Sequence, residues 1–261
     1  MKKISLGSRM KEFYENRTRT YLPRRTYTLI RIDGKAFHTF TKGLPAPFSE
    51  KLINAMNFTA EVLCKEIQGV KFGYVQSDEI SLVLTDFDTL ETSAWFDGNI
   101  QKITSVAASI ATKAFNAFWL ADEEDSSSAE MFYRMSAAFD ARAWTINQKN
   151  EVINYFLWRQ EDAIKNSIAS VAQSEFSTKE LHKKNQKDQL DMLEKIGINW
   201  YCDFDEGKQR GRVIEKFEIL KNGAKKFEFL KNGATRTKWI AHAALSIREY
   251  PNFLKNLLPD L

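Results

Sequence analysis

The residues best suited to chemistry are carboxylates that follow or separate predicted β-strands. The β-rich run TYTLIRID (26–33) ends at Asp33, and Gly34 comes directly behind it. A second acidic pair, Asp78 and Glu79, lies in a predicted tight turn between two short strands. Each motif alone is also typical of an ordinary turn. Whether they act together therefore depends on the elements that position them.

The order of the predicted elements brings both motifs to one edge of a sheet. Hydrophobic periodicity predicts β-α-β-β-α-β, the split βαβ pattern of a ferredoxin-like sheet. In this pattern the third strand lies between the first two and antiparallel to both, about 4.8 Å from the first. The end of the first strand and the turn between the second and third then meet. The strands are expected at 26–33, 70–76, 80–85 and 136–144, and the helices at 48–68 and 99–120.

Converging carboxylates predict a divalent cation, because they repel each other unless a positive charge lies between them. The chain has two cysteines, three histidines and no CxxC pair, so a zinc site is not expected. Hard oxygen ligands indicate Mg²⁺, and two such ions can activate an attacking oxygen and stabilise a departing pyrophosphate. The glycine after Asp33 lets its own carbonyl approach a metal closely.

The composition is that of a globular protein with a substantial core. The chain has 261 residues, of which 43% are hydrophobic, and a formal net charge of +4. This mild excess permits nucleic-acid binding without arguing for it. We expect reduced thiols and a cytoplasmic protein. The most apolar segment, 105–121, includes Lys113 and Asn116, so a packed helix is expected there and no membrane span.

The C-terminal part of the chain does not continue the β-α-β-β-α-β pattern. Residues 150–173 and 177–195 are predicted to be helical. A tandem repeat, KFEILKNGA at 216–224 and KFEFLKNGA at 226–234, ends each copy in Asn-Gly, which favours hairpin turns and a β-meander. We expect a catalytic palm at 1–145 and a helical and β-hairpin extension at 146–261 that packs on it.

Four segments resemble, in order, the signature segments of the tRNA(His) guanylyltransferase superfamily. The resemblance runs from about residue 5 to 215. It implies an α+β fold, a ferredoxin-like polymerase palm (βαββαβ) with additional helices. The segments are RIDGKAFHTFTKG (31–43), GYVQSDEISLVL (73–84), FDARAW (139–144) and NYFLWRQEDAIKNSIASVAQ (154–173).

The resemblance also implies an activity and its partners. Members of this family extend chains in the 3′-to-5′ direction. ATP or GTP first activates a 5′-monophosphate on tRNA, and the 3′-hydroxyl of an incoming nucleoside triphosphate then attacks the activated end. Mg²⁺ serves both steps, and two ions are expected. The partners implied are tRNA, nucleoside triphosphates and further copies of the chain in a homotetramer.

Site residues are implied by matching positions. Asp33 and Asp78 match the metal-binding aspartates, the backbone carbonyl of Gly34 matches a further ligand, and Glu79 matches the adjacent acidic residue of the catalytic set. The nucleotide-binding positions implied are Asp33, Gly34, Lys35, Ala36, Phe37, His38, Ser77, Asp78, Lys102 and Arg142.

Several of these positions have a plain structural alternative. His38 could be a structural histidine, and Phe37 could belong to the core. Lys102 could lie on a solvated helix face, and Arg142 could pair with Asp140. These alternatives stay open on the sequence alone.

The chain also departs from the eukaryotic pattern. Its IKNSIAS segment (164–170) has Ile164 where eukaryotic members have a histidine. Ala46 and Asn99 replace basic residues. The pattern fits the bacterial and archaeal tRNA(His) guanylyltransferase-like proteins better, which implies template-dependent repair of the tRNA 5′ end. The alternatives are strict G addition to tRNA(His), a nucleotide cyclase, or a non-catalytic RNA-binding palm.

Overall fold

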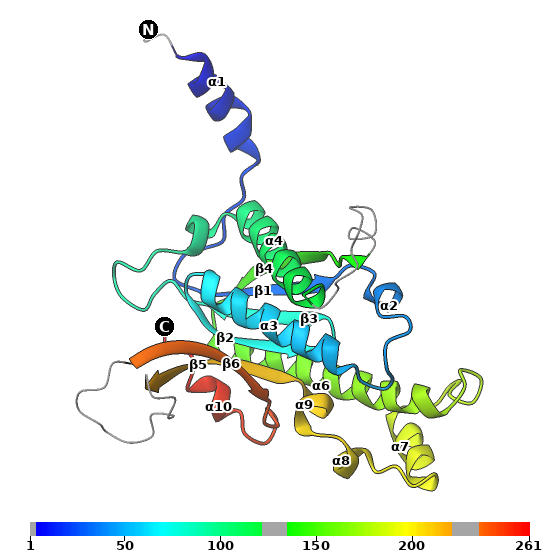
Figure 1. Ribbon diagram of the computed structural model, residues 1–261. Helices are drawn as coiled ribbons and strands as arrows, with labels where there is room; N and C mark the ends of the chain where they lie inside the picture. The colour runs from blue at the N-terminus through cyan, green and yellow to red at the C-terminus, as the bar shows by residue number, and fades with distance from the viewer. Residues whose placement is uncertain (1–3, 122–134, 221–234) are drawn as a thin grey trace.

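The fold is built around one sheet, seen in a computed structural model that describes residues 4–121, 135–220 and 235–261 (Figure 1). The six strands follow the order β4-β1-β3-β2-β5-β6, and every neighbouring pair is antiparallel. The first four strands in this order have the ferredoxin-like arrangement expected from the sequence. The strands are β1 (Tyr27–Gly34), β2 (Val70–Gln76), β3 (Glu79–Leu84), β4 (Phe139–Ile146), β5 (Arg212–Leu220) and β6 (Thr235–Ala243).

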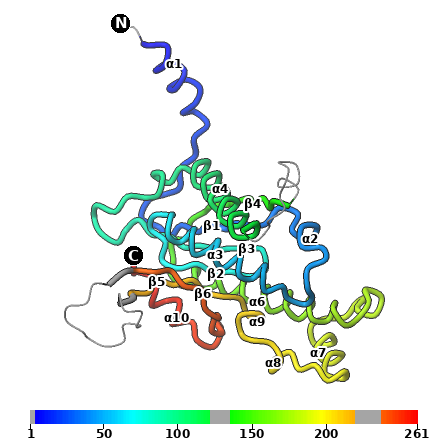
Figure 2. Tube along the Cα trace, in the orientation of Figure 1, coloured from blue at the N-terminus to red at the C-terminus, as the bar shows by residue number. Residues whose placement is uncertain are grey.

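Helices cover both faces of the sheet. Figure 1 shows α3 and α4 in front of it and α6 behind, and Figure 2 shows α1 projecting from the body. The helices are α1 (Leu6–Phe13), η1 (Glu15–Thr18), α2 (Phe37–Phe40), α3 (Glu50–Glu66), η2 (Trp95–Gly98), α4 (Ile100–Trp119), α6 (Lys149–Glu175), α7 (Gln186–Lys195), α8 (Trp200–Asp203), α9 (Glu206–Arg210) and α10 (Asn252–Lys255).

The α3 and α4 layer forms because both helices have a capped start and an apolar face. The side chain of Ser49 accepts from the Leu52 amide at the start of α3, and Asn99 accepts from the Lys102 amide at the start of α4. Such caps satisfy amides that have no partner inside the helix. The apolar faces of both helices pack on the inner residues of the strands and complete the larger core cluster.

The 27-residue α6 covers the opposite face. Phe156 is fully buried and packs against Phe72 with ring centroids 4.7 Å apart. Alternate residues of each strand point to opposite faces. Tyr27 and Leu29 of β1 therefore pack toward α6, whereas Ile30 and its even-numbered neighbours pack toward α3 and α4.

Most predicted elements are confirmed, and one helix is wrong in extent. The segment predicted at 177–195 is helical only from Gln186, because Asn185 and Asp188 form a capping box that begins α7 there. The Asn-Gly turns of the tandem repeat lie outside the described residues. On either side of them, β5 and β6 pair with each other, and β5 pairs with β2. The C-terminal hairpin thus extends the palm sheet, while the division at residue 145 stays a prediction.

The sequence also predicts that the two cysteines are reduced and that the most apolar segment is a packed helix. Cys64 is buried, Cys202 is exposed, and neither forms a disulfide. Residues 105–119 of the apolar segment belong to α4, as expected, and the buried face of this helix packs in the core. Across the described ranges, no helix is both long enough and apolar enough to cross a bilayer.

The turn into β5 generates a prediction about Gly211. This residue has φ 81° and ψ −172°, and an added Cβ would lie 2.6 Å from the Tyr74 hydroxyl and 2.7 Å from the Val75 carbonyl oxygen. Gly211→Ala should therefore lower the free energy of unfolding by about 3 kcal/mol, measured by urea denaturation. Gly197 has φ +85° with open space around it, so Gly197→Ala should cost about 1 kcal/mol. Equal losses would show that the close approach to β2 is unimportant.

Candidate active site

The two acidic motifs lie side by side because β1 pairs with β3. In the register, Asp33 is opposite Glu79. The amide of Gly34 donates to the carbonyl of Asp78 at 3.2 Å, which joins the two loops directly beyond the paired strands. The Lys35 amide donates to Ala138 at 2.8 Å and ties the first loop to the start of β4. The predicted convergence at one sheet edge is therefore present.

Both loops contain backbone that L-residues rarely adopt. Ala36 has φ 54° and Ser77 has φ 45°. An added Cβ on Gly34 would come within 2.2 Å of the Phe37 ring, so only glycine fits at this position. Strained residues of this kind cluster at functional sites.

The Asp33 and Asp78 side chains border a polar recess of ≈ 280 Å³, called here the acidic recess. Burial raises the pKa of Asp78, the nearby Asp33 and Glu79 charges raise it further, and a hydrogen bond from Ser77 opposes the shift. Negative charge is thus concentrated here. The recess is lined by Arg31, Asp33, Gln76, Ser77, Asp78, Glu79, Arg159, Asp162 and Asn166.

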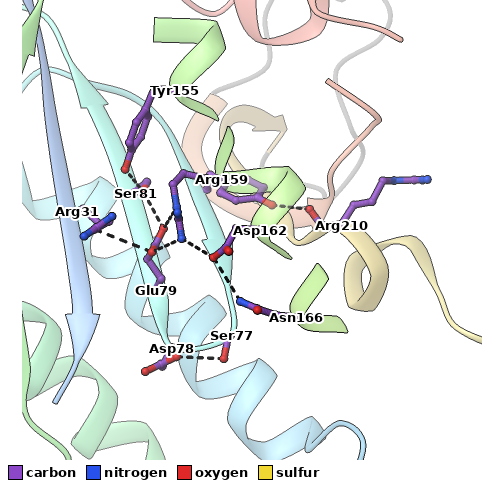
Figure 3. Close-up of polar contacts among 11 residues, drawn as sticks. Arg31, Ser77, Asp78, Glu79, Ser81, Tyr155, Arg159, Asp162, Asn166 and Arg210 are labelled. Atoms are coloured by element: carbon purple, nitrogen blue, oxygen red, sulfur yellow. Dashed lines mark hydrogen bonds and ion pairs between the residues drawn. The ribbon is translucent and has the colours of Figure 1, made fainter. Parts of the chain in front are cut away.

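Glu79 does not share the environment of the two aspartates, because it forms a buried ion pair with Arg159 of α6 (Figure 3). Nε and Nη2 of Arg159 each donate to a Glu79 carboxylate oxygen at 2.7 Å. The exposed fractions are 7% for Glu79 and 6% for Arg159. Although burial disfavours its charged form, the bonds to Glu79 raise the pKa of Arg159. Glu79 is oriented by an arginine, and its expected place in the catalytic set stays a prediction.

The ion pair belongs to a longer polar chain. Arg159 also donates to Asp162 at 2.9 Å, and Asn166 donates to the same carboxylate at 3.3 Å (Figure 3). On the other side, Nε of Arg31 is 4.0 Å from Glu79 and is buried without a hydrogen-bond partner among the described residues. None of these four residues is among the site residues expected from the sequence. All four lie in segments that resemble the family, 31–43 and 154–173, but a place in such a segment does not by itself distinguish a site residue from one that packs in a strand or helix.

Burial also affects the tyrosine above this ion pair. Tyr155 exchanges a hydrogen bond of 2.8 Å with Ser81, and burial raises the pKa of Tyr155 to about 12. The phenol is therefore neutral at physiological pH and serves as a packing and hydrogen-bonding group.

A second hollow, called here the loop recess, has a volume of ≈ 390 Å³ and meets the acidic recess at Ser77 and Asp78. His38 and Lys35 of the first loop are exposed, and Nε2 of His38 lies 3.1 Å from the Thr39 hydroxyl. Phe37 is buried among the rings of Phe40, Phe115 and Phe139, as its core alternative proposed. Phe37 nevertheless borders the loop recess, so its place in the core and its expected place beside the nucleotide are compatible.

Two of the implied nucleotide-binding residues, Arg142 and Lys102, lie in different places. Arg142 lies opposite Arg31 in the β1–β4 register, on the same sheet face as Asp33, and 3.8 Å from Asp140. Lys102 lies in the first turn of α4, beside the Phe96 ring, at the opposite end of the sheet.

The distance of Lys102 follows from the helix geometry. Thr112, ten residues further along α4, accepts from the Phe139 amide at the near end. Ten residues of helix span about 15 Å. Within one chain the structure therefore does not bring Lys102 to Asp33 and Asp78.

The donor atoms at the edge fit a hard divalent cation. Two carboxylates and a glycine carbonyl are oxygen ligands of the kind that Mg²⁺ prefers. The described residues contain no group of three or more His, Cys, Asp or Glu side chains that could hold a metal. Phosphate oxygens and water would have to complete the coordination, which is usual for Mg²⁺.

The Glu79–Arg159 pair yields a stability prediction. Arg159→Met leaves a buried carboxylate without its main partner and should lower the free energy of unfolding by about 3–5 kcal/mol in chemical denaturation. Adding Glu79→Leu should recover part of that loss. Arg248→Met breaks the exposed pair with Glu161 and should cost less than about 1 kcal/mol. Additive losses in the double variant would contradict this account.

Comparison with known proteins gives a consistent result. Residues 7–147 match the family description "Thg1: tRNAHis guanylyltransferase". The tRNA(His) guanylyltransferase of Schizosaccharomyces pombe is 30% identical over 145 residues, 55% of this chain and 51% of that protein. The chain thus spans about half of that curated relative. An uncharacterised protein of Acanthamoeba polyphaga mimivirus is 26% identical over 84% of this chain and 80% of its own length.

Solved structures agree over nearly the whole chain. A bacterial tRNA(His) guanylyltransferase (Thg1)-like protein in complex with ATP has a TM-score of 0.82 and 39% identity, and covers 98% of this chain and 99% of its own. The tRNA(His) guanylyltransferase of Saccharomyces cerevisiae shares the fold, with a TM-score of 0.66, 22% identity and coverage of 80% and 92%. The chain therefore belongs to the Thg1 family of tRNA(His) guanylyltransferases, which are nucleotidyltransferases.

Proposed function

We propose that this protein adds nucleotides to the 5′ end of tRNA in the 3′-to-5′ direction, directed by the opposite strand, after ATP or GTP activates the 5′-phosphate. The observation that carries this proposal is the joining of Asp33 and Asp78 at one sheet edge, between two recesses that meet at Asp78. Similar bacterial proteins are solved in complex with ATP and with GTP, which supports nucleoside triphosphates as substrates.

The shapes of the recesses suggest how a nucleotide lies. The loop recess combines apolar and polar walls, as small-molecule sites usually do. A base would lie there, beside His38, with its phosphates directed toward the acidic recess. Lys35, exposed on the first loop, and Arg142, on the same sheet face as Asp33, offer positive charge for the phosphate oxygens.

Mg²⁺ would be held by the carboxylates of Asp33 and Asp78 and the carbonyl of Gly34. When bound, it neutralises phosphate charge and favours the attacking oxygen and the leaving pyrophosphate. The protein residues supply position. The Gly34–Asp78 hydrogen bond holds the two aspartates at one edge, and Arg159 orients Glu79 away from competing ligation. Two metal ions remain part of the proposal.

One residue favours templated addition over strict G addition to tRNA(His). Ile164, which stands where eukaryotic members have a histidine, packs against the apolar cluster of α6, α7 and α8. An alkyl side chain in that setting offers no hydrogen bond to an anticodon or to a base. Base pairing with the opposite strand would then choose the nucleotide. The homotetramer and the cytoplasmic location implied earlier stay predictions.

An incorporation assay distinguishes the candidate functions. With ATP, all four nucleoside triphosphates and Mg²⁺, a tRNA lacking its first 5′ nucleotide should gain the Watson–Crick match to the opposite base, whichever base is present there. Sequencing of the extended product checks this. Insertion of G opposite every base would favour strict G addition. Cyclic nucleotide formed without RNA would indicate a cyclase, and no extension of several truncated tRNAs would contradict the proposal.

Variants at the edge test the chemistry. Asp33→Asn and Asp78→Asn should each reduce incorporation by about a thousandfold or more, because transition-state charge loses its stabilisation. Asp88 pairs with Lys71 at the opposite end of the sheet, so Asp88→Asn should retain activity. Activity retained in Asp33→Asn would favour a non-catalytic RNA-binding palm.

The raised pKa of Asp78 predicts a pH-dependent stability without metal. A raised carboxyl pKa means that stability is lost as pH rises from the usual aspartate pKa through the raised one. In EDTA, Asp78→Asn should therefore gain stability relative to wild type as pH rises through this window. At neutral pH, Mg²⁺ should raise the melting temperature of wild type more than that of Asp78→Asn. Equal Mg²⁺ effects on both proteins would argue against metal binding at this edge.

A further inference from the structure

A third hollow, called here the inner recess, lies beyond the end of β2 and has a volume of ≈ 140 Å³. It shares Ser77 with both recesses of the active site, and it shares Gln76 with the acidic recess. Its walls come from the N-terminus of α3, the middle of α6 and the turn between α9 and β5. It is therefore an inward continuation of the active site that the proposed function does not yet use.

Arg212 is the most unusual residue of this recess. It is 9% exposed and lines the recess from the start of β5. Its Nε donates to Oδ1 of Asn57 at 2.7 Å, and its Nη1 donates to the Gly207 carbonyl at 3.2 Å. Both acceptors are neutral, and no carboxylate of the described residues forms an ion pair with it. A buried charge without a direct ion pair costs free energy. Burial lowers the pKa of Arg212 to about 10, although the nearby charges of Asp205 and Glu50 act in the opposite direction.

Gln76 supplies a second, independent sign of a ligand. Its side chain is 4% exposed and lines both the inner and the acidic recess. Its Oε1 is buried without a hydrogen-bond partner among the described residues. Buried polar groups are nearly always satisfied, so this unmet acceptor oxygen at the wall of a cavity indicates either a missing donor or an amide whose oxygen and nitrogen are exchanged. Rotation of the amide would present its N–H groups to an acceptor.

The N-terminus of α3 adds positive potential. Ser49, the N-cap of this 17-residue helix, lines the recess together with Leu52. Helix N-termini bind anions through free amides and the helix dipole. Lys208 also lines the recess, but its charge is offset by Glu50 at 2.6 Å and Asp205 at 3.3 Å. These two carboxylates outweigh the single charge of Lys208, so the positive groups that border the recess without an ion-pair partner among the described residues are Arg212 and the N-terminus of α3.

We propose that the inner recess is a phosphate-binding subsite in which Arg212 is the charged ligand and Gln76 a neutral one. A volume of ≈ 140 Å³ holds one tetrahedral anion and is small for a whole nucleotide. The phosphate could be the 5′-phosphate of an RNA or part of a nucleoside triphosphate. Only the choice between these sources rests on the proposed function. Phosphate binding itself is measurable without nucleotidyl transfer.

The first experiment uses inorganic phosphate as the probe. Isothermal titration of the full chain, with chloride as the ionic-strength control, should show saturable phosphate binding. Arg212→Met should weaken one binding event by about tenfold or more, because a charged hydrogen-bonding partner is lost. Arg210→Met is the matched control: Arg210 is two residues away, pairs with Glu206 at 2.6 Å and does not line the recess, so binding should persist.

Two further variants distinguish the loss of a phosphate ligand from the loss of the fold. Arg212→Lys keeps the charge and should retain part of the phosphate affinity, whereas Gln76→Glu places a negative charge at the recess and should weaken binding as Arg212→Met does. Circular dichroism and thermal melting establish which variants are folded, and only those are compared. Equal phosphate affinity in wild type, Arg212→Met and Gln76→Glu would overturn the proposal, as would the absence of saturable binding to wild type.

Competition identifies the source of the phosphate. If the subsite takes an RNA end, Arg212→Met should weaken binding of a 5′-phosphorylated RNA and leave a 5′-hydroxyl RNA unaffected. If it takes a nucleotide tail, the same variant should weaken ATP binding relative to adenosine. Either result supports the subsite. If wild type binds phosphate in the inner recess but adds no nucleotide to truncated tRNA, the result would contradict the proposed function and leave the subsite intact.

Discussion

The antiparallel pairing of β1 with β3 is the interaction on which the site depends. It places Asp33 opposite Glu79 and, through the Gly34–Asp78 hydrogen bond, brings two carboxylate-bearing loops together against their mutual repulsion. The pairing is secured by apolar burial on both faces of the sheet, with α3 and α4 on one side and α6 on the other. The core thus holds charges in an arrangement that they would not adopt alone.

The arginines around Glu79 set the charge of this edge. Glu79 would add a third negative charge beside the aspartates, but Arg159 of α6 donates to both of its carboxylate oxygens. Arg31 lies on the other side of the same carboxylate. Asp33 and Asp78 are consequently the carboxylates of the acidic recess that Arg159 does not engage, whereas Glu79 and Asp162 both accept hydrogen bonds from it.

The functional surface is a set of connected hollows around one turn. The Ser77 turn borders the acidic, loop and inner recesses, which are respectively acidic, mixed and basic. This contrast suits a reaction in which phosphates must be held near a cation while another phosphate or a base is held apart. A polymerase-like palm therefore has separate compartments within a few residues of the edge at which we propose that metal binds.

The sequence by itself determined the elements and the edge. Period-two and period-3.6 patterns are local, so β1–β4, α3 and α4 could be predicted, and their order dictated which ends meet. Neither the pairing of Glu79 with Arg159, 80 residues apart, nor the buried position of Arg212 against neutral acceptors has a local signature, since each depends on how α6 and β5 dock on the sheet. Lys102 shows the converse: its match to a family position implied nucleotide binding, but the direction of α4 placed it at the far end of the sheet. Side-chain environment is a property of packing between distant segments, and only the tertiary structure decided it.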